Sequence, residues 1–222
     1  MTSPTGWESG IVTGSIVVFG GGGHGRVVIE ALRAAGESTP VAVLDPALAG
    51  KVDGVPVRQG GGAAAALRAA GVEAAAIGVG SVGDTAARRR VHGEALAAGF
   101  TLPPVVHPRA SIAGTASLAP GCFVGAGAVV GPGARIGEGA IVNSNAVVDH
   151  DCLLGAFVHI APGAALSGGV VVGDDAHVGT GAAVVQGARI GAGALVGAGA
   201  SVIADVPEGA VAVGVPARSE PR

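Results

Sequence analysis

Hydrophobic residues in the second half of the chain recur at every sixth position. Beginning at Ile112, each sixth residue is Val, Ile or Leu through sixteen consecutive hexads without a shift of register. The fifth residue of each hexad, from Ala116 to Val206, is always Ala, Cys or Val. Two inward positions per six residues, one bulky and one small, are typical of a hexapeptide β-helix. The sequence therefore predicts a parallel β-helix over this half.

The first half follows a different pattern, in which apolar runs alternate with helix-like segments. Strands are predicted over residues 15–20, 41–45 and 74–80. Helices are predicted over residues 26–36, 63–71 and 85–99, the first of them ending at Gly36. Alternating strands and helices indicate a small parallel sheet. We therefore expect a flexible N-terminus over residues 1–14, an α/β Rossmann-like domain over 15–105 and a β-helix domain with a C-terminal tail over 106–222.

Composition and charge exclude several classes of function. With 42 Gly, no Tyr, one Trp and four Phe, the core cannot depend on aromatic packing. The formal charge of −3, with no basic run beyond Arg88-Arg89-Arg90, argues against binding to nucleic acid. The first ten residues lack the features of a signal peptide, and no long apolar window is present. We expect a cytoplasmic protein without membrane insertion, in which Cys122 and Cys152 are buried apolar fillers.

One charged cluster, VVDHDC, interrupts the repeats at residues 147–152. The hexad register places His150 and Asp151 at positions three and four, where side chains point outward at a corner. Charges at equivalent positions, such as Asp174, indicate that solvation alone can explain such residues. A histidine can take up a proton near neutral pH, however, and an adjacent acid can fix its tautomer. Catalysis and solvation both remain open on spacing alone.

The hexads resemble those of the hexapeptide-repeat acyltransferases, whose fold is a left-handed β-helix with three hexads per triangular turn. Sixteen hexads then give about five turns. VVDHDC, IVNSNA and FVHIAPG are similar to motifs of nucleotide-sugar acetyltransferases, in the branch of sialic acid O-acetyltransferase-like proteins and bacterial 4-amino-sugar N-acetyltransferases. The DHD cluster also resembles that of GDP-perosamine N-acetyltransferases. The resemblance implies a homotrimer with active sites between subunits, and the exposed Ala and Val of one helix give a physical motive for association.

The resemblance also implies roles for individual residues. His150 matches the general base and Asp151 the acid that raises its basicity, while Asn143 matches a position at the sugar. Asp149 receives no role. The positions that match contacts of acetyl-coenzyme A are His159, Gly168, Gly169, Thr180, Ala198 and Arg218. Gly168 and Gly169 would lie along the thioester, where a free N–H supports an oxyanion; turn geometry alone is the alternative explanation.

A metal site is the weaker interpretation of the histidines. His159 and His177 occupy the same position of hexads that lie one full turn apart, so they should stack on adjacent turns. This arrangement invites comparison with γ-class carbonic anhydrases, which bind zinc through histidines on the same fold. Those enzymes use a histidine pair five residues apart, and none of the six His here has that spacing. We therefore expect no metal.

A glycine-rich turn, GGGGHG, follows the first predicted strand. Gly20, Gly22 and Gly25 match the dinucleotide fingerprint G-x-G-x-x-G, and Asp45 follows twenty residues after Gly25. Taken alone, this motif would suggest an NAD enzyme. The resemblance instead assigns the nucleotide sugar to this domain.

In the resembling enzymes, Gly22, Gly23, His24 and Gly80 match positions at the sugar nucleotide, and the acid at Asp45 helps to read the base. Some UDP-sugar enzymes have two acids in succession where this chain has Asp45-Pro46, so both UDP and GDP stay open.

The function predicted from the sequence is acetyl transfer from acetyl-coenzyme A to the amino group, at C4, of a nucleotide-linked amino-dideoxy sugar, for bacterial surface glycan synthesis. The alternatives are O-acetylation of a sugar hydroxyl, a γ-carbonic-anhydrase-like metalloenzyme, and a nucleotide-sugar-binding trimer without chemistry.

Overall fold

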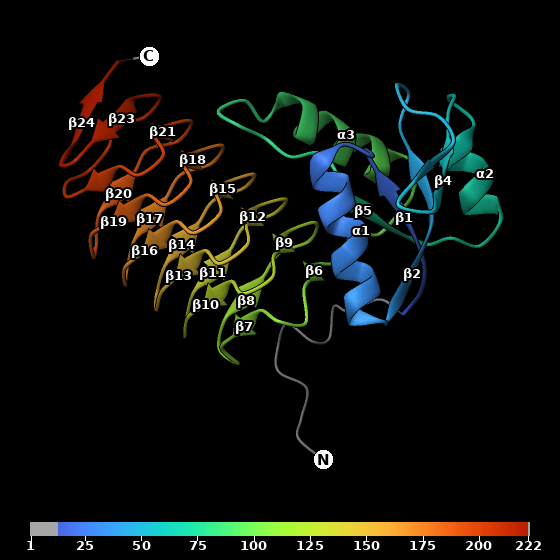
Figure 1. The fold of residues 1–222 in the computed structure, drawn as a ribbon, viewed down its shortest axis with the longest axis horizontal. Helices are drawn as coiled ribbons and strands as arrows, with labels where there is room; N and C mark the ends of the chain where they lie inside the picture. Colours follow the sequence, from blue (N-terminus) through green and yellow to red (C-terminus); the bar gives the residue numbers. More distant parts are fainter. Residues whose placement is uncertain (1–12, 222) are drawn as a thin grey trace.

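The structure is a computed structural model that describes residues 13–221. Figure 1 shows an α/β domain at one end of a long β-helix, with the C-terminus at the other end. Of the predicted flexible N-terminus, residues 1–12 lie outside the described part of the chain, and Gly14 begins the first strand.

The N-terminal domain has the predicted strands and helices. The parallel strands β1 (Gly14–Phe19), β2 (Ser38–Leu44), β4 (Val55–Arg58) and β5 (Ala74–Ile77) form a sheet, whose edge strand β3 (Lys51–Val52) is antiparallel to β4. The helices are α1 (Gly23–Ala35), α2 (Ala63–Ala69) and α3 (Ala86–Ala97). Gly36 ends α1 as predicted, in the left-handed conformation that glycine favours. The β3–β4 hairpin was not predicted, because its short strands carry no clear alternation.

The second half is a left-handed β-helix, as the hexads predicted. Its two-residue strands form three flat faces. Face 1 consists of β7 (Ser111–Ile112), β10 (Val129–Val130), β13 (Val147–Val148), β16 (Ala165–Leu166), β19 (Ala183–Val184) and β22 (Ser201–Val202). Face 2 consists of β8 (Ser117–Leu118), β11 (Arg135–Ile136), β14 (Leu153–Leu154), β17 (Val171–Val172) and β20 (Arg189–Ile190).

Face 3 begins with β6 (Val105–Val106), one strand ahead of the first regular hexad. It continues with β9 (Phe123–Val124), β12 (Ile141–Val142), β15 (His159–Ile160), β18 (His177–Val178) and β21 (Leu195–Val196). A final antiparallel hairpin, β23 (Val211–Gly214) and β24 (Ala217–Glu220), extends this face. Along all three faces, each strand of the hexads pairs with the strand three hexads further on, for example Val130 with Val148.

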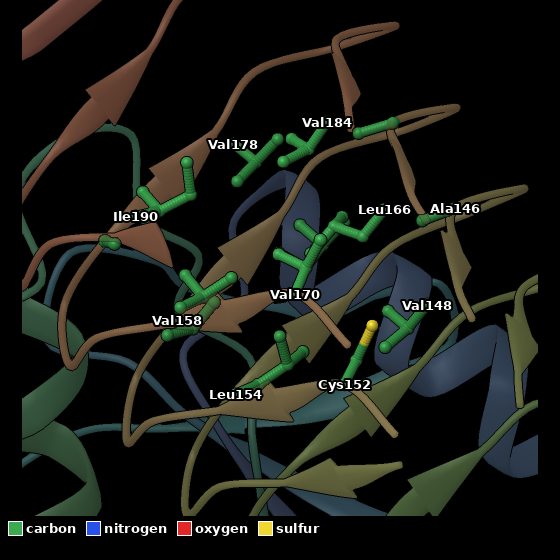
Figure 2. Close-up of a cluster of buried hydrophobic side chains, with 14 of the residues drawn as sticks. Ala146, Val148, Cys152, Leu154, Val158, Leu166, Val170, Val178, Val184 and Ile190 are labelled. Atoms are coloured by element: carbon green, nitrogen blue, oxygen red, sulfur yellow. The ribbon is translucent and has the colours of Figure 1, made fainter. Parts of the chain in front are cut away.

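The interior of the β-helix is filled by the two inward positions of each hexad. Figure 2 shows large side chains such as Val148 and Leu166 packed with small ones such as Ala146. Cys122 and Cys152 lie in this core, 1% and 0% exposed, as predicted. Burial raises the pKa of the Cys122 thiol to about 12, which keeps that thiol protonated and inert.

The N-terminal domain packs against face 3. The outward side chains of Phe123 and Ile141 are buried in one apolar cluster with Ile16 and Val28 of the α/β domain. In the order of the chain, face 3 leads to face 1, face 1 to face 2 and face 2 back to face 3. We call the turns between them corner 3–1, corner 1–2 and corner 2–3. Because each turn is a triangle, corner 1–2 lies opposite the face that the N-terminal domain covers.

Candidate active site

His150 and Asp151 form an exposed pair at corner 1–2. The His150 Nδ1–H donates to Asp151 Oδ2 across 3.0 Å, which leaves Nε2 free to accept a proton. Asp149, for which no role was predicted, accepts the His150 backbone N–H on Oδ1 at 2.7 Å. The hydrogen bond that His150 donates to Asp151, and then the charge of Asp149, raise the pKa of His150 above its ordinary value. The imidazole is therefore a stronger base than a free histidine.

Asp151 adopts a backbone conformation that most corners of this β-helix leave to glycine. Its φ is 58°, and Gly133 and Gly169 have φ of 71° and 69° at the same hexad position on the adjacent turns. A non-glycine residue in this region is uncommon, although Asp and Asn tolerate it best. The aspartate thus occupies a position where glycine would be less strained, and its side chain holds His150.

Gly168 leaves the space that the imidazole of His150 occupies. It lies at the same hexad position as His150 on the next turn, and a Cβ added to it would collide with His150 Nε2 and Cε1. The Gly169 N–H donates to the His150 carbonyl oxygen at 2.8 Å. That N–H belongs to the β-helix ladder and is not free to support an oxyanion. Both glycines lie against His150, and their predicted place along the thioester stays a prediction.

Asn143 and His159 lie elsewhere, where face 3 turns into corner 3–1. The Asn143 Nδ2–H donates to His159 Nε2 at 3.1 Å, and the His159 Nδ1–H donates to the Ser81 carbonyl oxygen at 2.6 Å. Burial lowers the pKa of His159 to about 4, so the ring is neutral and can accept from Asn143. Both ring nitrogens of His159 are thus engaged within the chain. His177 stacks beside His159 on the next turn, as predicted, with ring centroids 4.9 Å apart.

The glycine turn has the three features of a dinucleotide fingerprint. Gly20, with φ 96°, makes the tight turn after β1, and a Cβ on Gly25 would collide with the Gly20 carbonyl oxygen. Gly22 and Gly23 are exposed, with open space where a side chain would lie. Asp45 stabilises this turn, because its Oδ2 accepts the Gly21 N–H at 2.9 Å.

His24 and Gly80 line the boundary between the two domains. The imidazole of His24 meets the Phe123 ring edge-on at 5.1 Å, and Gly80 lies beside the His24 Cβ. Burial lowers the pKa of His24 to about 3, so this ring is neutral. Its Nε2 is buried and has no hydrogen-bond partner within residues 13–221.

The predicted site residues therefore fall into two groups within one chain. His150, Asp151, Gly168 and Gly169 gather at corner 1–2. The second group lies on face 3, at corner 3–1 and in the N-terminal domain: Gly22, Gly23, His24, Asp45, Gly80, Asn143, His159, Thr180 and Ala198. Arg218 is exposed on β24. The triangular cross-section separates His150 and Asp151 from the residues of the same chain that were predicted to lie at the nucleotide sugar.

Two polar links between the domains were missed from the sequence. Arg88, 1% exposed, donates from Nε to the Gly139 carbonyl oxygen at 2.8 Å and from Nη1 to the Val79 carbonyl oxygen at 2.6 Å. Arg89 forms two hydrogen bonds with Asp175, at 2.6 and 2.8 Å. Asp175 stands at position four of its hexad with φ 61°, a position and conformation that most turns of the β-helix give to glycine. An aspartate in place of glycine was the sequence signal that could have pointed to this contact.

Across residues 13–221, no group of three or more His, Cys, Asp and Glu side chains is arranged to hold a metal ion. No helix in the same range is long and apolar enough to cross a membrane.

A β-helix of hexads with an exposed His–Asp pair at a corner defines a hexapeptide-repeat acyltransferase. Comparison with family models supports this class. Residues 15–95 match the PglD N-terminal domain, residues 115–150 match the bacterial transferase hexapeptide (six repeats), and residues 150–186 and 169–204 match the hexapeptide repeat of succinyl-transferase. A search of curated protein sequences found no match.

Solved structures are similar over nearly the whole chain. The acetyltransferase domain of PglB from Neisseria gonorrhoeae, in complex with acetyl coenzyme A, is 39% identical; the match covers 93% of this chain and 98% of that one, with a TM-score of 0.85. PerB from Caulobacter crescentus, in complex with CoA and GDP-perosamine, is 43% identical; the match covers 93% and 97%, with a TM-score of 0.86. WeeI from Acinetobacter baumannii is 27% identical, with coverage of 94% and 100% and a TM-score of 0.71. The chain belongs to the hexapeptide-repeat sugar N-acetyltransferases that carry a PglD-type N-terminal domain.

Proposed function

We propose that the protein transfers the acetyl group of acetyl-coenzyme A to the C4 amino group of a nucleotide-linked amino-dideoxy sugar. The observation that carries the proposal is the His150–Asp151 pair, with its raised basicity and free Nε2, in a chain of this family. The likeness to PerB, solved with GDP-perosamine, supports GDP as the nucleotide, and UDP is the alternative. Synthesis of a bacterial surface glycan in the cytoplasm is the setting that we propose.

In the reaction, the amine nitrogen attacks the thioester carbonyl carbon. Nε2 of His150 accepts a proton from that nitrogen, directly or through water, and coenzyme A leaves as the thiolate. Asp151 keeps the proton of the resting imidazole on Nδ1 and stabilises the imidazolium that forms. No covalent enzyme intermediate is needed, because the two substrates meet directly.

A homotrimer would join the two groups of residues that one chain keeps apart. His150 lies at the corner opposite the face that the N-terminal domain covers, which supports presentation of the amine by a second copy. Large exposed apolar side chains flank the same corner: Val129, Leu153, Val185 and Ile203 are 39% to 59% exposed. Such a group on the flat sides of a prism favours association with another subunit. Each active site would then take its base from one subunit and its sugar-binding residues from the next.

The test is a thiol-release assay with acetyl-coenzyme A and UDP-, GDP- and dTDP-linked 4-amino sugars. We expect one nucleotide class to be acetylated and His150→Ala to lose about 10²–10⁴-fold in rate. Paired 4-hydroxy sugars test O-acetylation. Release of thiol with none of the amino sugars, or full activity of His150→Ala, would contradict the proposal.

A further inference from the structure

Asn143 and His159 are joined by a hydrogen bond that fixes the orientation of the asparagine amide. Oδ1 of Asn143 accepts the Ser144 backbone N–H at 2.8 Å, so turning the amide over would lose that bond. One N–H of Nδ2 therefore points at His159 Nε2, 3.1 Å away. We propose that His159 is a positioning residue, whose Nε2 lone pair holds the Asn143 amide so that its second N–H reaches an oxygen acceptor of the nucleotide sugar. The inference rests on the proposed function, because it takes Asn143 to lie at that substrate.

The N-terminal domain sets the tautomer of His159. The Ser81 carbonyl oxygen can only accept, so its 2.6 Å contact requires a proton on His159 Nδ1. Burial keeps the ring neutral, since it lowers the pKa of His159 to about 4. A neutral ring with its proton on Nδ1 has a lone pair on Nε2, which is what the N–H of Asn143 needs. With the other tautomer, two N–H groups would face each other and the amide would lose its hold.

The ring of His159 has little freedom to turn. It is 8% exposed, and His177 of the next turn packs edge-on against it, with ring centroids 4.9 Å apart. The segment that carries Ser81 leads into α3, whose N-cap residue Thr85 donates its hydroxyl to Asp175 Oδ1 on the β-helix. The carbonyl that sets the tautomer is thus anchored to the β-helix that carries the histidine. Docking of the N-terminal domain and orientation of the Asn143 amide are therefore linked.

This arrangement limits what His159 can offer to acetyl-coenzyme A. Both ring nitrogens are engaged within the chain, so the ring can touch the coenzyme through its carbon atoms but has no N–H or lone pair left for it. The second N–H of Asn143, by contrast, has no acceptor among residues 13–221. The polar action of His159 is therefore directed through Asn143 toward the sugar, a role that the family resemblance did not assign to it.

The test compares two replacements of His159 that each keep one of its hydrogen bonds. The side-chain carbonyl of His159→Gln reaches the place of Nε2 and still accepts from Asn143, whereas the amide of His159→Asn stops at the place of Nδ1 and keeps only the bond to Ser81. The substrate is the GDP- or UDP-linked 4-amino sugar that the wild type acetylates, assayed by thiol release at saturating acetyl-coenzyme A. His159→Asn should lower kcat/KM for this sugar about tenfold or more, and His159→Gln less than about threefold. A rise confined to KM for acetyl-coenzyme A, with kcat/KM for the sugar within about twofold of the wild type in both variants, would overturn the inference.

A double-mutant cycle shows whether His159 acts through Asn143. Asn143→Ala removes the amide, so adding His159→Asn to it should cause no further loss of kcat/KM for the sugar. His92→Asn is the control, because it alters another buried histidine between α3 and the β-helix. Its effect should be the same with or without Asn143→Ala. Losses that multiply for His159→Asn and Asn143→Ala would mean that the two residues act separately, which contradicts only this inference.

Heteronuclear NMR of the intact protein gives a readout that does not depend on activity. His159 should carry its proton on Nδ1. One side-chain N–H of Asn143 should be protected from hydrogen exchange in the wild type and His159→Gln, and should lose that protection in His159→Asn. A proton on Nε2, or equal exchange in all three proteins, would overturn the inference. A wild type that acetylates none of the sugars contradicts the proposed function, and NMR still decides whether His159 holds Asn143.

Discussion

His150 and Asp151 are chain neighbours whose side chains meet across 3.0 Å, with the Nδ1–H of the histidine donated to the carboxylate. The contact combines two uncommon features, a histidine at a β-helix corner and an aspartate in the left-handed conformation, φ 58°. Asp149, which accepts the His150 backbone N–H, adds a second negative charge near the ring. The corner therefore stabilises the protonated imidazole, which is the form that a general base reaches as it takes up the amine proton.

The pH profile of the reaction should report this pair. Because the base acts in its neutral form and its pKa is raised, kcat/KM should rise with pH through an inflection above about 6.5, the ordinary value for histidine. Asp151→Asn removes the largest cause of the shift, so the inflection should move to lower pH. The plateau rate should fall roughly tenfold or more, because the base is weaker.

Rate measurements from pH 5 to 9 check this prediction. Glu208→Gln, which removes an exposed carboxylate from the far end of the β-helix, is the control and should keep the wild-type profile. An inflection at the same pH in the wild type and Asp151→Asn would show that the carboxylate does not act on the imidazole.

Gly168→Ala should displace the imidazole without unfolding the corner. Gly168 does not have a positive φ, so alanine fits its backbone, but the new Cβ would collide with His150 Nε2. A displacement near 1 Å from the productive position can cost about 10²-fold in rate. We expect kcat to fall by at least about tenfold, with a melting temperature close to that of the wild type.

The control is Gly93→Ala on α3, where a Cβ meets open space and activity should be unchanged. Full activity of Gly168→Ala would mean that the His150 ring occupies a different position during catalysis.

Mixed trimers can test whether the active site is shared between subunits. His150→Ala and Asn143→Ala remove one residue from each of the two groups, and each variant alone should be nearly inactive. After the two are unfolded together and refolded, some sites in mixed trimers would combine an intact His150 from one subunit with an intact Asn143 from another. Partial recovery of thiol release is therefore expected. If every site were built within one chain, no mixed trimer would contain an intact site and activity would stay absent.

The sequence predicted the β-helix well because the rule is local and repeated. A bulky residue at position one and a small residue at position five, as in Val148 and Cys152, are enough to set which side chains point inward. The register also placed His150 and Gly168 on the same corner, since three hexads make one turn. The register thus predicted that His150 and Gly168 share a corner, whereas the role of His150 as base came from the family resemblance and stays a prediction.

Contacts between the domains could not be predicted in the same way. Asn143 and His159 share a face with the Ser81 loop because the N-terminal domain docks on face 3, and nothing in the hexads specifies that docking. The role of Asp149 was missed because it depends on the local path of the backbone at His150. The sequence also showed Arg88-Arg89-Arg90 only as a short basic run, although the three side chains have very different surroundings.

Arg88 and Arg90 provide a matched pair for testing what holds the two domains together. Arg88 is buried between them and donates to carbonyl oxygens of Ile77 and Val79 on one side, and of Gly121 and Gly139 on the other. Burial lowers its pKa to about 10, so it remains charged at neutral pH. Arg90 is exposed, and its one ion pair among residues 13–221 is with Glu94. Removing the Arg88 guanidinium should leave buried carbonyl groups without donors, at about 1–3 kcal/mol each.

Arg88→Met should therefore lower the melting temperature by several degrees or more, since about 1 kcal/mol corresponds to roughly 2–4 °C for a chain of this size. Arg90→Met should stay within about 0.5 kcal/mol of the wild type, because an exposed ion pair contributes little. Both variants are to be melted at one protomer concentration, since association makes the melting temperature depend on concentration. Gly80, which matches a position at the sugar nucleotide, follows Val79, and the Ser81 carbonyl oxygen holds His159, which matches a contact of acetyl-coenzyme A. Arg88→Met should therefore also raise KM for both substrates. Equal melting temperatures for the two variants would contradict the role of Arg88 as the link between the domains.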